Sequence, residues 1–216
     1  MSMIIEGRTV LMKKIYEDKD ILVVHKEAGL AVQSRSPLVQ DLESMLLTDL
    51  MKKSKDGRKP ELHVINRLDQ PVEGLVLFAK NKKTAAGLTH QLTEGKIEKI
   101  YRAEVTGQIP KEEDILTDYL LKDGRTNTSR VVANGTPKSK QAVLSYKKLS
   151  DSELEIRLMT GRHHQIRVQL SNAGMPIKGD RKYGRPDPDY NGRLMLTACR
   201  LAFIHPVTGK HMDLSI

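Results

Sequence analysis

The stretch NRLDQP at residues 66–71 is followed closely by the apolar run LVLFA at residues 75–79. This run has the length and composition of a buried β-strand. Gln70 precedes a proline, which keeps it out of the helical conformation, and Gly74 permits an unusual backbone angle before the strand. We therefore expect Asp69 on a constrained bend at a sheet edge, where rigid placement suits a nucleophile or an acid–base group.

The local residues also allow a plainer interpretation of Asp69. Aspartate is a common turn residue near proline, because its carboxylate accepts hydrogen bonds from the following backbone. Short motifs of this kind often match by chance. On these residues alone the turn interpretation is favoured, so a functional role for Asp69 depends on the rest of the chain.

The composition is that of a soluble, basic, globular protein. The 216 residues carry a formal net charge of +9 and contain one cysteine, Cys199, which excludes an internal disulfide. No apolar run is long enough to span a membrane. A chain without an internal disulfide fits a reducing compartment, so we expect a cytoplasmic protein. Aromatic residues make up only 4% of the chain, which argues against a protein that binds single strands by stacking. The charge favours RNA bound through its phosphates.

The periodicity of the chain predicts an α+β fold, with a mixed, mainly antiparallel sheet flanked by helices and loops. We expect residues 1–15 to form a short leader and residues 16–216 to form one domain. Loops are expected over residues 52–59 and, as a long loop or hairpin, over residues 122–140. Strands are predicted near residues 21–24, 100–105, 142–146, 154–158, 201–204 and 212–216, and helices near residues 36–51, 82–94 and 163–173.

A second motif, TGRHHQIR at residues 160–167, is placed where a strand ends and a helix begins. Arg162 and Arg167 could hold RNA phosphates, or pair with a buried aspartate and keep it ionised. A solvated basic turn is the plainer alternative. Adjacent histidines suggest zinc, but His163 and His164 would diverge by about 100° on a helix, and no cysteine lies near them.

Tyr101 is the third candidate, within the strand predicted at residues 100–105. Its ring could stack on a base and its hydroxyl could move a proton. Tyrosine more often simply fills a strand. The basic stretches at residues 52–59, 138–148 and 178–185 are candidate phosphate contacts; for any single stretch a solvated face is the better interpretation.

These motifs, in this order, resemble the RluA-type pseudouridine synthases. The resemblance rests on Arg67-Leu68-Asp69 with Ala79-Lys80-Asn81, on the stretch KIYRAEVTG at residues 99–107, on residues 160–167 with the following GMPIKGD and Tyr183-Gly184, and on LAFIHPVTG at residues 201–209. It extends from about Tyr16 to the end of the chain.

The resemblance implies a catalytic Asp69, a Tyr101 that stacks on the target base, and an Arg167 that forms a salt bridge with Asp69. It implies isomerisation of uridine to pseudouridine in structured RNA, ribosomal or transfer, without cofactor or metal, in a cleft across the middle of the sheet. Separately, we expect the protein to be a monomer. The residues then expected to contact the substrate are Arg67, Lys80, Arg162, His163, His164 and Gln165.

The chain departs from the family pattern in three places. Asn66 stands where the family usually has histidine, and Val72-Glu73 stands where it has Thr-Ser. The leader is also too short for the RNA-binding S4 domain that many members carry. These departures leave open a catalytically silent RNA-binding protein on the same scaffold. A third hypothesis is a metal-dependent hydrolase that uses the histidines.

Overall fold

The computed structural model describes residues 2–5, 8–11, 13–34, 36, 38–54, 59–184 and 190–216. The chain divides into two compact units, here called unit 1 and unit 2. Unit 1 comprises residues 1–97 and 200–216, and unit 2 comprises residues 98–199. The two units share the strand β12 (Leu196–Ile204), which begins in unit 2 and ends in unit 1.

Unit 1 is built on antiparallel strands in the order β3-β4-β6, with β5 also paired to β6 and β13 paired to β12. Its N-terminal strands β1 and β2 form a separate two-stranded sheet within the predicted leader. The elements are β1 (Ser2–Ile5), β2 (Arg8–Leu11), β3 (Lys13–Glu17), β4 (Ile21–Lys26), α1 (Leu42–Lys53), β5 (His63–Val64), β6 (Glu73–Ala79), α2 (Lys82–Thr93) and β13 (His211–Ser215).

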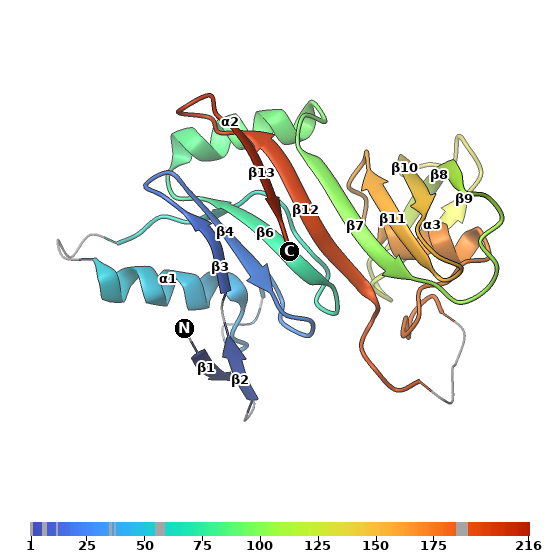
Figure 1. Ribbon diagram of the computed structural model, residues 1–216, viewed down its shortest axis with the longest axis horizontal. Coiled ribbons are helices and arrows are strands. Elements are labelled where there is room, and N and C mark those ends of the chain that lie inside the picture. The colour runs from blue at the N-terminus through green and yellow to red at the C-terminus, as the bar shows by residue number, and fades with distance from the viewer. Residues whose placement is uncertain are drawn as a thin grey trace. The chain divides into compact units, whose positions relative to one another are not determined.

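The core of unit 1 lies on both faces of β4 and β6, because alternate residues of a strand point to opposite faces. On one face Leu75 and Leu77 pack in a cluster with Leu88 of α2. Phe78, on the other face of β6, is also fully buried. Figure 1 shows α1 and α2 on opposite sides of these strands. The continuous apolar run after Asp69 is thus a strand buried on both faces.

The three predicted helices exist, but one begins later than expected. We predicted the first helix to begin near Ser36 and residue 37, and residue 37 lies outside the described residues. The helix α1 instead begins at Leu42, because Asp41 forms a capping box with Ser44. Its last turn contains Lys52 and Lys53, where cations are favoured at a helix C-terminus. The loop predicted at residues 52–59 therefore starts later, and residues 55–58 lie outside the described part of the chain.

The described residues of unit 2 include antiparallel strands in the order β7-β11-β10-β8-β9 and the short helix α3. Buried Leu120, Ala142 and Val168 form a core cluster that joins β8, β10 and α3. The elements are β7 (Glu98–Glu104), β8 (Glu113–Asp123), β9 (Thr128–Val132), β10 (Lys140–Lys148), β11 (Glu153–Leu158) and α3 (Gln165–Asn172).

The long polar segment of unit 2 is a hairpin, one of the two forms predicted for residues 122–140. Strands β8 and β9 pair from Tyr119↔Val132 to Asp123↔Thr128, around a turn in which Asn127 has a positive φ of 51°. The strand β8 was missed by the sequence reasoning, because it alternates exposed and half-buried residues and so carries little apolar signal. The predicted α+β class with a mixed, mainly antiparallel sheet and flanking helices is confirmed.

Candidate active site

Asp69 lies on a tight bend between β5 and β6, as the sequence predicts. The backbone N–H of Val72 donates to the carbonyl of Asp69 at 3.0 Å and closes a turn over Gln70 and Pro71. Gly74 then adopts a φ of +131°, a conformation that glycine tolerates best. The half-buried Asp69 is therefore held at the entry to a strand that is buried from Gly74 to Ala79.

The side chain of Lys26, at the end of β4, fixes the bend through hydrogen bonds to backbone carbonyls. Its fully buried ammonium donates to the carbonyls of Gln70 at 3.1 Å and Leu30 at 2.7 Å, and also to that of Glu27. The Gln70 carbonyl accepts from Gly29 N–H as well, at 2.9 Å. Burial lowers the pKa of Lys26 to about 7, while the charge of Asp69 acts to raise it. A buried cation thus lies close to the candidate catalytic carboxylate.

Asn66, one of the departures from the family pattern, binds the backbone of β6 through its side-chain amide. Its side-chain amide donates to the carbonyl of Leu75 at 3.1 Å and accepts from the N–H of Leu77 at 2.7 Å. Asn66 is buried, so both bonds are shielded from water. The other departure, Glu73, contacts the ring of His25 at 3.0 Å. Both residues therefore have local partners inside unit 1.

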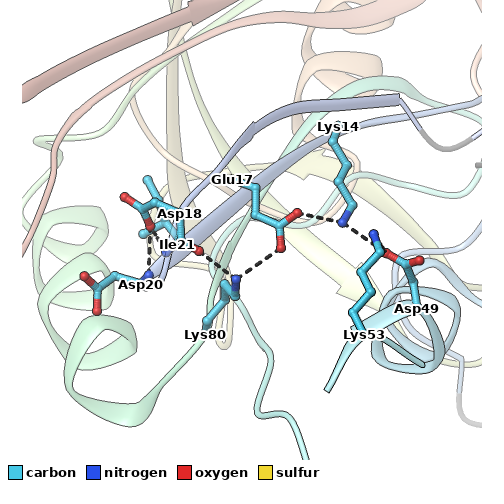
Figure 2. Close-up of polar contacts among 8 residues, drawn as sticks. All are labelled: Lys14, Glu17, Asp18, Asp20, Ile21, Asp49, Lys53 and Lys80. Carbon is cyan, nitrogen blue, oxygen red and sulfur yellow. Dashed lines mark hydrogen bonds and ion pairs between the residues drawn. The ribbon is translucent and has the colours of Figure 1, made fainter. Parts of the chain in front are cut away.

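The two cations that flank the Asp69 segment differ in their surroundings. Arg67 is exposed and makes no hydrogen bond or ion pair with any residue in the described ranges. Lys80 donates to Glu17 at 3.1 Å and to the carbonyl of Asp18 at 2.6 Å. Figure 2 shows Lys80 at the end of a polar chain that continues from Glu17 through Lys14 to α1. The charge of Lys80 is thus already balanced within the protein.

In unit 2, the residues of the motif at 160–167 hold the start of α3 in place. The Gln165 side chain accepts from the Thr160 hydroxyl at 2.7 Å and from the N–H of Arg162 at 2.9 Å. Gln165 is buried, whereas Arg162 is exposed and donates through Nε to the carbonyl of Gln141. Gln165 therefore has a clear structural role, and its predicted contact with substrate stays a prediction.

The two histidines stack on each other, with ring centroids 3.7 Å apart. His163 contacts the Ser129 hydroxyl of β9 at 2.9 Å, and His164 contacts the Tyr183 hydroxyl at 2.7 Å. His164 has a φ of +54° and occupies the N-cap position of α3, where its side chain makes no capping hydrogen bond. Burial, and then the charge of Arg167, lower the pKa of His164 to about 4, so this ring is neutral at pH 7. Hydrogen bonds to protein groups on different elements thus orient the histidines.

Arg167 is buried and held by Asp180 through two parallel hydrogen bonds, from Nε at 2.8 Å and from Nη2 at 2.7 Å. The guanidinium carbon also lies 5.1 Å from the centre of the Tyr183 ring. Burial acts to raise the pKa of Asp180, but the bonds and charge of Arg167 outweigh it and hold that pKa below its ordinary value. The pairing of Arg167 with Asp69 stays a prediction.

Tyr101 lies in β7 opposite Ile156 of β11, and it is buried. Its neighbour Ile100 is buried as well, so the strand is covered on both faces at this point. We expected one of the two side chains to face the core and the other the opposite face. The structure leaves the role of Tyr101 as predicted from the family resemblance.

One group among the described residues has the composition of a metal site. Ligand atoms of Asp18, Asp20 and His205 lie within 4.8 Å of one another. However, His205 Nδ1 accepts from two backbone N–H groups, so its proton is on Nε2, which contacts Asp18 at 3.0 Å. A metal ion would have to displace that proton. The spacing of these residues in the sequence did not suggest the group.

Three residues of the candidate site were missed by the sequence reasoning. Lys26 follows the predicted strand at residues 21–24, and nothing in its local sequence indicates that it is buried. Asp180 and Tyr183 belong to a block that resembled the family, but no role was assigned to them. Their positions beside Arg167 depend on the turn that follows α3, which local sequence does not determine.

Comparison with known proteins finds one family over most of the chain. Residues 20–172 match the model of a family described as RNA pseudouridylate synthase. The ribosomal large subunit pseudouridine synthase C of Buchnera aphidicola is 32% identical, over 96% of this chain and 67% of the relative. The ribosomal large subunit pseudouridine synthase D of Zymomonas mobilis is 30% identical, over 96% of this chain and 69% of the relative.

Solved structures show the same fold. The human RNA pseudouridylate synthase domain containing 1 superposes with a TM-score of 0.75 at 22% identity, over 95% of this chain and 83% of that chain. The human RNA pseudouridylate synthase domain containing 4 gives the same TM-score and identity, over 94% of this chain and 87% of that chain.

We predict that Asn66→Ala lowers the free energy of unfolding by about 2 to 4 kcal/mol, because it leaves a buried N–H and a buried carbonyl of β6 unpaired. Urea denaturation measures this loss. Asn172→Ala, at the exposed end of α3, is the control and should cost little. Equal stability of the Asn66 variant and the wild type would show that these two hydrogen bonds do not stabilise the fold.

We predict that neutral His164 makes unit 2 acid-sensitive. Its pKa is about 4 when folded and about 6.5 when unfolded, so the unfolded state binds more protons between these values. Stability is therefore lost as the pH falls from 6.5 to 4, by up to about 3 kcal/mol.

The measurement is the free energy of unfolding against pH for the wild type and His164→Asn. Asparagine tolerates the positive φ and can still accept a hydrogen bond from Tyr183. The difference between the two curves should shrink on acidification. Exposed His90→Asn serves as the control, and a constant difference for His164→Asn would disprove the assignment.

Proposed function

We propose that this chain, which belongs to the RNA pseudouridylate synthase family, isomerises uridine to pseudouridine in RNA with Asp69 as its catalytic carboxylate. The observation that carries the role of Asp69 is its rigid bend. That bend is closed by the Val72 N–H and anchored through Gln70 to the buried ammonium of Lys26. A carboxylate held in one place can act repeatedly on the same sugar carbon.

The reaction conserves the atoms of uridine. The bond between the base nitrogen N1 and the sugar C1′ breaks, and a bond between base C5 and C1′ forms. N1 gains a proton and C5 loses one, so neither oxidant nor reductant is needed. Asp69 serves either as a nucleophile towards the nucleotide or as the charge that stabilises a sugar intermediate. In either mechanism the carboxylate of Asp69 must be ionised.

We assign the remaining catalytic roles from the family resemblance. Tyr101 stacks on the target base, and Arg167 pairs with Asp69 and keeps it charged. The two hydrogen bonds that Arg167 donates to Asp180 support this assignment, because they fix the plane of the Arg167 guanidinium. A planar group held on one edge is pre-oriented for a carboxylate partner.

The substrate class follows from charge and from the relatives. A net charge of +9 favours a polyanion. The first relatives are named ribosomal large subunit pseudouridine synthases, so we propose ribosomal RNA as the substrate. The target base must be flipped out of folded RNA. Exposed Arg67 is better suited to a phosphate than Lys80, whose charge Glu17 already balances.

We also propose where the protein acts and in which oligomeric state. None of the described helices is long and apolar enough to cross a membrane. We expect the protein to act as a monomer in the cytoplasm, where ribosomal RNA is available. The RNA-binding cleft across the middle of the sheet stays a prediction as well.

A catalytically silent RNA-binding protein is the alternative, motivated by Asn66 and Glu73. Both departures have partners inside unit 1: Asn66 on the backbone of β6, and Glu73 on His25. Neither contact disrupts the turn that carries Asp69. The geometry therefore favours the enzyme over the silent protein.

Asp69→Asn should abolish pseudouridine formation while RNA binding is largely retained, because the amide keeps the size of the carboxylate and loses its charge. Pseudouridine is counted by chemical derivatisation of total RNA from cells that lack the gene and carry either form. Exposed Asp151→Asn is the matched control. Pseudouridine formation by the Asp69 variant at the wild-type rate would exclude its catalytic role.

Asp180→Asn should lower both the rate of isomerisation and the free energy of unfolding, the latter by about 3 kcal/mol, because it uncouples a buried ion pair. The control is Asp213→Asn, which breaks an exposed bidentate pair with Arg200 and should cost at most about 1 kcal/mol. Rates are compared at a temperature at which all forms are folded. Full activity in the Asp180 variant would show that Arg167 needs no such support.

A further inference from the structure

Lys99 occupies an unusual position in β7, two residues before Tyr101. Only 8% of Lys99 is exposed. Because alternate residues of a strand share a face, Lys99 and Tyr101 point to the same side of β7, with Cα atoms about 7 Å apart. Ile156, which pairs with Tyr101 across the ladder, is fully buried on that side. The stem of Lys99 is therefore packed on the face that carries the proposed base-stacking residue.

The ammonium of Lys99 reaches the loop that leads into α3. Its Nζ lies 4.0 Å from the position that a Cβ on Gly161 would occupy. Gly161 is exposed and has no side chain to cover the amine. The ammonium of Lys99 thus lies beside the motif at residues 160–167, on a side chain that is buried as a whole.

Lys99 makes no hydrogen bond or ion pair with any residue that the structure describes. Two other lysines of unit 2 do have partners: Lys111 pairs with Asp114 at 2.8 Å, and Lys178 with Glu104 at 2.6 Å. Burial lowers the pKa of Lys99. A cation taken out of water without a counter-charge is costly, and such a cost is typical of a binding site that awaits an anion.

We propose that Lys99 is a phosphate-binding residue, whose ammonium takes a non-bridging phosphate oxygen of the RNA close to the nucleotide that Tyr101 contacts. The proposal rests on the proposed function, which supplies RNA as the ligand. A phosphodiester fits the site because it is permanently anionic and accepts from the three N–H groups of an ammonium. Binding would restore the charge balance that the free protein lacks.

The test measures the affinity of the full chain for an in vitro transcript of large-subunit ribosomal RNA across a range of salt concentrations. Lys99→Met keeps the apolar stem and removes the charge. It should weaken binding by about tenfold and reduce the salt slope by about 1, the signature of one lost phosphate contact. Lys111→Met removes a charge that Asp114 already balances, so it should change the affinity little.

Two further readouts separate phosphate binding from other roles of Lys99. Without RNA, Lys99→Met should melt at or above the wild-type temperature, because it removes an unpaired buried charge. Lys99→Arg should retain most RNA affinity and isomerase activity, since arginine keeps the charge but does not release a proton.

The following results would overturn the proposal. If Lys99→Met leaves the RNA affinity and the salt slope unchanged, Lys99 binds no phosphate. If it lowers the melting temperature and leaves the affinity unchanged, Lys99 is a structural residue. Normal RNA binding with lost activity in Lys99→Arg would indicate proton transfer instead. If inorganic phosphate saturates the site without affecting RNA affinity, the ligand is free phosphate. If binding depends on Lys99 but the wild type forms no pseudouridine, the proposed function fails and the phosphate site stands.

Discussion

The arrangement around Asp69 depends on one buried ammonium, that of Lys26. Backbone carbonyls removed from water need donors, and Lys26 supplies them to Gln70 and to the loop that contains Leu30. Burial lowers the pKa of this ammonium, and the negative charge of nearby Asp69 acts against that lowering. One side chain thus fixes the backbone of the bend and sets the electrostatic environment of the carboxylate.

Among its described residues, unit 2 contains two further buried cations, one balanced within the protein and one not. Buried Arg167 is balanced by Asp180, as Lys26 is balanced by carbonyls and by Asp69. Lys99 is a third buried cation, and no described residue balances it. Lys26 and Arg167 are therefore structural cations, with acceptors or counter-charges inside the protein. For Lys99 we propose that the RNA is the partner.

The sequence predicted what depends on local pattern. Apolar runs and Asn81 gave the strand β6 and the helix α2, and Gly74 marked the strained entry to the strand. The start of α1 was misplaced, because the helix is capped by Asp41 with Ser44 and not by Ser36. The partners of Lys26 and Arg167 come from segments that only the fold brings near, so no local pattern could identify them.

The central claim is that the chain isomerises uridine in RNA through Asp69. The most direct measurement uses total RNA labelled with tritium at C5 of uridine, taken from cells that lack this gene. Because C5 loses its hydrogen when it bonds to the sugar, the account predicts that the purified wild-type chain releases tritium to water and that Asp69→Asn does not. No release by the wild type, or equal release by both forms, would contradict it.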